Sequence, residues 1–125
     1  MGLLSGLLGH SSKTDVTALQ KEFQPLLIEG EVLVAAYRVI RDMIVFTNKR
    51  LILVEKQGVT GTKADYQSIP YARIIRFSKE SAGITDLDAE LKLWIVGAQQ
   101  PLVKTFGRGD GVNEVYQLLS KAVLD

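Results

Sequence analysis

The spacing of apolar residues predicts a short helix near the start of the chain. Between residues 14 and 27 the apolar side chains recur at helical spacing, and Asp15 is placed to cap the first turn. Because Pro25 has no amide hydrogen for a helical bond, we expect the helix to end or tighten near Phe23.

The middle of the chain is typical of short antiparallel strands. Val, Ile, Leu, Tyr and Phe dominate residues 32–54, where two polar breaks predict three consecutive strands. The second break contains Asn48, which fits a tight hairpin because Asn tolerates a left-handed backbone. Further strands are expected at 64–69, where Pro70 confines the chain to an edge or a bend, and at 74–77.

The segment after the next loop alternates regularly, which indicates a strand with one buried face. Leu91, Leu93 and Ile95 share one side, and Glu90, Lys92 and Trp94 share the other. A last strand is expected over LVKTF. The apolar stripe over 112–123 then fits one face of a helix, and Asp110 is expected to cap its first turn.

These elements add up to about seven antiparallel strands, with a short N-terminal helix before them and an amphipathic helix after them. This order predicts the α+β class. A bent barrel with the C-terminal helix over its open end hides the sheet edges, and this is the pleckstrin-homology-like architecture. We expect one domain over 13–125, preceded by an apolar N-terminal segment over 1–12.

Three stretches also carry a resemblance to a known family. FTNKRLILV, IPYARI and DLDAELKLWI, with the opening MGLLSGLL, resemble the bacterial pleckstrin-homology (PH) domain proteins, formerly a domain of unknown function. The resemblance covers nearly the whole chain and rests on structural signatures, so it informs the fold more than the function. It implies self-assembly into rings or larger homo-oligomers, with no established ligand.

Composition excludes several classes of protein. The chain has 15 basic and 14 acidic residues and a net charge of +1, so no overall field attracts nucleic acid. The absence of cysteine excludes disulfides and thiolate metal sites and fits a reducing compartment, so we expect a cytoplasmic protein. The uncharged apolar stretch over 1–10 is far shorter than a membrane-spanning helix.

No constellation of residues points to catalysis, so we expect no enzyme, no metal and no cofactor. His10 is the only histidine, and no carboxylate or second histidine stands near it in the sequence. Asp86, Asp88 and Glu90 resemble the start of a calcium loop, but Leu91 stands where that loop requires glycine.

Basic residues on the early strands are candidates for an anion or lipid contact. They are Arg38, Arg41, Lys49 and Arg50. Eukaryotic PH domains that bind phosphoinositides carry basic residues in and beside the loop between their first two strands. Here that loop is short and Asp42 opposes its basic residues, so the headgroup site is not carried over. Solvated strand faces are the simpler interpretation.

Two apolar features are candidates for an oligomer interface. The first is the helical face formed by Leu3, Leu4, Leu7 and Leu8, which is costly to expose to water. We expect it to contact a neighbouring subunit, its own domain or a membrane. Subunit contact is preferred, since no Lys or Arg precedes Lys13 to attract anionic lipid. The second is Trp94, on the polar face of its strand, unless a loop or helix covers it.

The sequence thus predicts a non-enzymatic scaffold or protein-binding module that forms a homo-oligomer, with cyclic symmetry. The alternative is a peripheral membrane domain that binds lipid. The expected partners are other copies of the chain and a protein or peptide, with the membrane surface as the alternative and without nucleic acid.

Overall fold

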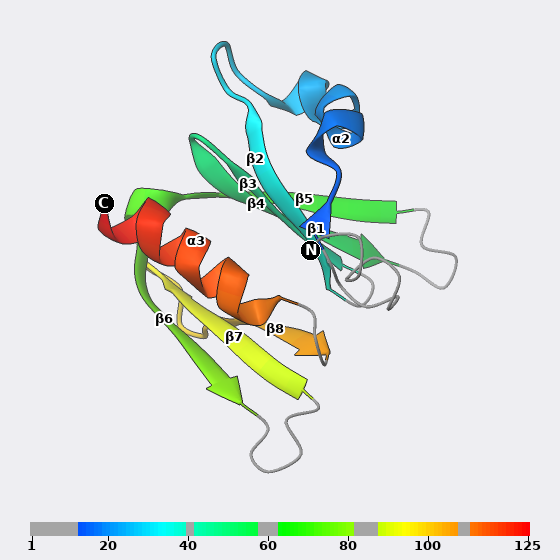
Figure 1. Ribbon diagram of the computed structural model, residues 1–125. Coiled ribbons are helices and arrows are strands. Elements are labelled where there is room, and N and C mark those ends of the chain that lie inside the picture. Colours follow the sequence, from blue (N-terminus) through cyan, green and yellow to red (C-terminus); the bar gives the residue numbers. More distant parts are fainter. Residues whose placement is uncertain (1–12, 40–41, 58–62, 82–87, 108–110) are drawn as a thin grey trace.

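Two antiparallel sheets and two helices make up the computed structural model, which describes residues 13–39, 42–57, 63–81, 88–107 and 111–125 (Figure 1). Helix α2 (Val16–Phe23) lies beside the first sheet, and helix α3 (Val112–Leu124) lies between the two sheets. The predicted α+β class with a short first helix and a C-terminal helix is therefore confirmed.

The first helix begins and ends as the sequence predicts. The Asp15 side chain accepts a hydrogen bond from the Thr17 amide at 2.9 Å, which satisfies one of the open donors of the first turn. The α-helix ends at Phe23 and continues as the 3-10 turn η1 (Gln24–Leu26), which holds Pro25. Both predictions, the cap and the tightening at proline, are confirmed.

The first sheet runs in the order β1-β2-β3-β4-β5, antiparallel throughout. Its strands are β1 (Lys13–Thr14), β2 (Leu33–Val39), β3 (Asp42–Thr47), β4 (Arg50–Gln57) and β5 (Lys63–Pro70). The three strands predicted between residues 32 and 54 are β2, β3 and β4. Pro70 is the last residue of β5, at the edge of this sheet, where a missing backbone donor costs little.

The second sheet runs in the order β6-β7-β8, and the 3-10 turn η2 (Tyr71–Arg73) leads into it from β5. Its strands are β6 (Ile74–Ser81), β7 (Asp88–Ile95) and β8 (Leu102–Gly107). The register between β6 and β7 shifts between Ile74 and Arg76. Because β2 and β8 also approach each other, the two sheets form the bent barrel that the sequence predicts.

Two apolar clusters bury both faces of the first sheet. Between the sheets, Val115 and Leu119 of α3 pack with Leu91 and Leu93 of β7 and with inward residues of β2 to β4. On the other face, α2 packs Phe23 against the sheet, beside Val45 and Ile52. This double burial explains why β3 and β4 are continuously apolar rather than alternating.

Helix α3 begins at a glycine. Its N-cap is Gly111, with a φ of 82°. Asp110, the predicted cap, lies outside the described residues, so its capping role stays a prediction. A left-handed backbone favours glycine at this position, because a Cβ there brings steric cost. Within the described residues no helix is both long and apolar enough to cross a membrane.

Candidate functional site

A buried ion pair joins the start of β2 to the turn between β3 and β4. The side chain of Glu31 is fully buried and accepts two hydrogen bonds from Arg50, from Nε to Oε2 and from Nη2 to Oε1, each at 2.8 Å. Thr47 Oγ1 donates to Oε2 at 2.6 Å, and the Ile28 amide donates to Oε1 at 3.0 Å. The bond from Arg50, against the opposing effect of burial, lowers the pKa of Glu31 to about 2.

Further hydrogen bonds join the β3–β4 turn to the segment that precedes β2 and to β5. Arg50 donates to the Leu26 carbonyl at 2.6 Å and to Ser68 Oγ at 3.0 Å. The Asn48 side chain accepts from the Val32 amide at 2.9 Å and donates to the Gly30 carbonyl at 3.0 Å. Asn48 is therefore more than a turn residue, because its amide group also fixes the chain that leads into β2.

Of the candidate anion contacts, Arg38 does not lie beside Lys49 and Arg50. Arg38 is exposed near the end of β2, opposite Met43, whereas the turn with Lys49 and Arg50 adjoins the other end of that strand. Arg38 is five residues along the strand from Leu33, which pairs with Thr47 beside this turn, and five residues of strand span about 16 Å. The guanidinium of Arg50 is moreover bound to Glu31, Leu26 and Ser68, so it is not a free surface cation. Arg41 lies outside the described residues.

A second buried cation connects the two sheets. Lys104 on β8 has a side chain that is only 7% exposed, and its Nζ lies 2.6 Å from Glu55 Oε2 and 3.3 Å from Asp42 Oδ2. These two carboxylates come from β4 and β3 of the other sheet. The cluster holds two carboxylates and one ammonium, so the charge of Lys104 is neutralised within the fold.

Trp94 lies on the outer face of the second sheet, as the alternation in β7 predicts. Leu91 and Leu93 are 1% exposed and face the core, while Trp94 is partly exposed and stands opposite Arg76 on β6. The Arg76 guanidinium carbon lies 4.4 Å from the centre of the Trp94 ring. This cation–π contact holds the ring in place on the outer face. Leu3, Leu4, Leu7 and Leu8 lie outside the described residues.

Three exposed apolar residues stand on or next to the strands of the second sheet near Trp94. Val103 on β8 is opposite Lys92, two residues from Trp94, and therefore shares its face. Val103 is 44% exposed, and Val96, just after β7, is 49% exposed. Ile75, beside Arg76 at the register shift, is 67% exposed. We call Ile75, Trp94, Val96 and Val103 the tryptophan patch.

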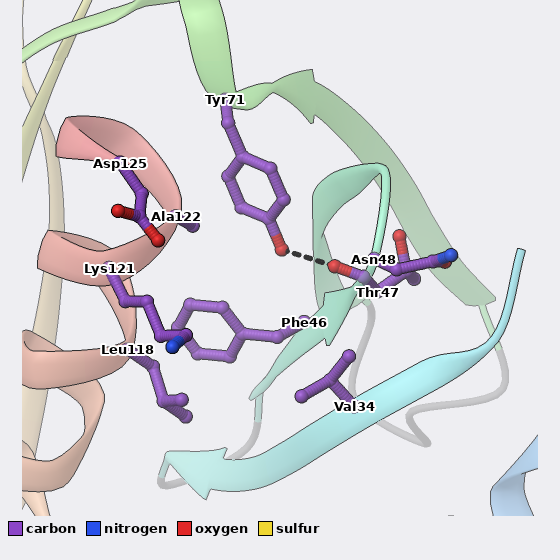
Figure 2. A pocket seen from close by; sticks show the side chains of 9 residues that line it. All are labelled: Val34, Phe46, Thr47, Asn48, Tyr71, Leu118, Lys121, Ala122 and Asp125. Carbon is purple, nitrogen blue, oxygen red and sulfur yellow. Dashed lines mark hydrogen bonds between the residues drawn. The ribbon is translucent and has the colours of Figure 1, made fainter.

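A groove of about 240 Å³ lies between α3 and the first sheet (Figure 2). The side chains that line it are Val34, Phe46, Thr47, Asn48, Tyr71, Leu118, Lys121, Ala122 and Asp125. The Tyr71 hydroxyl donates to the Thr47 carbonyl at 2.7 Å, the bond drawn in Figure 2. Burial raises the pKa of Tyr71. Burial and the hydrogen bond to Glu114 likewise raise the pKa of Tyr37. Both phenols therefore stay protonated and serve as hydrogen-bond donors.

The described residues offer little for catalysis. They contain no group of histidine, cysteine, aspartate or glutamate side chains that suits a metal ion. Their buried charges, Glu31 and Lys104, are already paired with partners inside the fold.

Comparisons with known proteins agree with this geometry. The family model for the bacterial PH domain matches residues 2–123. The chain is 50% identical to the uncharacterized protein YjqA of Bacillus subtilis over 121 residues, 96% of this chain and 97% of that protein.

Two crystal structures are similar over nearly their full length. The pleckstrin homology domain from Shewanella amazonensis SB2B has a TM-score of 0.86 and 48% identity, covering 99% of this chain and 100% of that chain. A DUF1696 family protein with a pleckstrin-homology domain from Shewanella loihica PV-4 has a TM-score of 0.82 and 47% identity, covering 91% of this chain and 97% of that chain. The predicted pleckstrin-homology-like fold is confirmed.

Proposed function

This chain belongs to the bacterial PH domain family, and we propose that it is a cytoplasmic, non-enzymatic scaffold and protein-binding module that self-associates through the tryptophan patch. The observation that carries this proposal is the exposure of apolar side chains around Trp94 on an otherwise polar sheet face. Contiguous apolar surface on a soluble domain is typical of a contact with another protein.

The geometry of Trp94 favours a role as an interface anchor. Its ring is held by Arg76 before any partner arrives, so little side-chain freedom is lost on binding. Tryptophan and arginine are the residue types that most often dominate interface energy. The neighbouring Val103 and Ile75 supply the apolar rim that excludes water from such an anchor.

The N-terminal leucines form the second part of the proposed interface. Leu3, Leu4, Leu7 and Leu8 carry no neighbouring charge that would keep them in water. Fully burying one leucine contributes about 1.5 to 3 kcal/mol, so even partial burial of these side chains offsets much of the cost of association. A ring built from one repeated contact satisfies both features in every subunit.

Light scattering of the full chain and its variants tests the proposal. We expect a discrete oligomer for the full chain and a lower mass for Trp94→Ala, for Val103→Glu and for removal of residues 2–9. Val32→Glu is the matched control, because Val32 is 51% exposed and lies outside the tryptophan patch. Circular dichroism establishes that each variant is folded.

The result that overturns the proposal is a full chain that stays monomeric over the whole concentration range. Flotation with anionic vesicles then addresses the alternative, a peripheral membrane domain. In the structure Arg50, one of the candidate headgroup contacts, is bound to the internal carboxylate of Glu31, which leaves one cation fewer for a headgroup than the sequence suggests.

A further inference from the structure

The second sheet has an open edge along β6. Within the described residues β6 pairs with β7 alone, in the order β6-β7-β8. In an antiparallel sheet, every second residue of an edge strand directs its N–H and C=O groups away from the paired neighbour. An extended chain can pair with these groups and add a strand to the sheet.

Helix α3 forms one wall beside this edge. A pocket of about 390 Å³ is lined by Lys79 of β6 and by Asn113, Tyr116 and Gln117 of α3. The rings of Phe77 and Tyr116 are 5.1 Å apart, so strand and helix pack together under the pocket. The lining offers amide and hydroxyl groups that can bond to the side chains of an added strand.

The edge is positively charged. Arg73 stands just before β6, and Arg76 and Lys79 lie on it; none of the three forms an ion pair with the residues that the structure describes. Two of the nearby carboxylates have partners of their own, and a third, Glu90 on β7, stands opposite Glu80. Glu80 pairs with Lys92 at 3.3 Å, and Glu114 accepts a bond from the Tyr37 hydroxyl.

The cations serve both faces of an added strand. Arg76 stacks on Trp94 at the outer face, and stacking leaves the N–H groups at the edge of the guanidinium for acceptors. Lys79 donates to Asn113 Oδ1 at 2.8 Å on the side of α3, which uses one of its three donors. An incoming strand with carboxylates on both faces therefore finds a cation on each.

We propose that the β6 edge binds an acidic, extended peptide segment of a partner protein, which adds as a strand and places a carboxylate beside Lys79. This inference deepens the protein-binding part of the proposed function and does not depend on self-association. Charge at a sheet edge also serves simply to prevent aggregation, and a purely protective edge binds no strand of either sign.

The test uses the intrinsic fluorescence of Trp94, the only tryptophan of the chain, because Arg76 connects its ring to β6. The probe is an end-blocked peptide of glutamate, threonine and valine as long as the 8 residues of β6. Two control peptides are used. One replaces each glutamate by lysine, and the other keeps the sequence but carries N-methyl groups on alternate backbone amides.

We expect saturable quenching or a spectral shift with the acidic peptide, weaker in high salt, and none with either control. Lys79→Glu should weaken binding about tenfold or more, whereas Lys63→Glu, on the edge strand of the other sheet, should leave it within about twofold. Equal binding of the N-methylated peptide, or no binding of the acidic one to folded protein, overturns the proposal. The mass from light scattering is measured separately, so failure of assembly is distinguished from failure at this edge.

Discussion

Arg50 and Glu31 meet side by side, with Nε and Nη2 of the guanidinium each donating at 2.8 Å to a different carboxylate oxygen. This two-point contact fixes the plane of both groups, and Thr47 and the Ile28 amide occupy further positions around the carboxylate. The pair therefore works as a structural clamp between the chain before β2 and the start of β4.

Removing one partner of this clamp should cost much of the fold's stability. Arg50→Met leaves the carboxylate of Glu31 buried without its main donor, and we expect a loss of about 3 to 5 kcal/mol in the free energy of unfolding. Lys49→Met, at the exposed neighbour, should change it by less than about 0.5 kcal/mol. Urea unfolding at neutral pH measures both, and equal effects would contradict the role assigned to the clamp.

Acid should destabilise the protein through Glu31. Its pKa falls from the ordinary 4.5 to about 2 on folding, mainly because of the bond from Arg50. The ionised form thus stabilises the fold fully above pH 4.5, and this contribution is lost as the pH falls toward 2. The stability curves of the natural chain and of Glu31→Gln, measured by urea unfolding, should converge over this interval. Parallel curves would exclude Glu31 as the titrating group.

Lys104 should matter far more than its surface counterpart Lys92. Lys104→Met leaves Asp42 and Glu55 without the cation between them, and we expect a loss of about 2 kcal/mol, since both carboxylates are partly exposed. Lys92→Met breaks only an exposed pair with Glu80 and should cost about 0.5 kcal/mol or less. Thermal unfolding of the two variants measures these losses of stability, and a larger loss for Lys92→Met than for Lys104→Met would refute the expectation.

A side chain at Gly111 should weaken the start of α3. Gly111→Ala forces an alanine into a backbone with φ of 82°, and we expect a loss of about 1 to 2 kcal/mol. A Cβ there meets Tyr37 Cε2 at 3.8 Å, an ordinary contact, so the cost comes from the backbone and not from a clash. Gly111→Asn, which tolerates this conformation, should lose less. Chemical denaturation of both variants tests the order.

The parts of the fold that follow a local pattern were predictable. The alternation in β7 placed Leu91 and Leu93 inside and Trp94 outside, and Asp15 stood next to the turn that it caps. Both signals lie within a few residues of the structure that they determine.

The ion pairs could not be predicted in the same way. Arg50 and Glu31 are 19 residues apart, and Lys104 is 49 residues from Glu55. No spacing rule connects partners at such separations, so each charge looked like an ordinary surface residue. The one available signal was the position of Lys104 in LVKTF. Alternation along this strand places Lys104 on the same face as Leu102 and Phe106, which is the core side.

The dependence of α3 on both sheets has a consequence for synthesis on the ribosome. Its Tyr116 packs on Phe77 of one sheet, and its Glu114 accepts a bond from Tyr37 of the other, yet α3 follows all the strands that the structure describes. While the chain emerges, the inner faces of both sheets therefore stay open until α3 has left the exit tunnel. During that interval the nascent protein exposes the surface on which chaperones act.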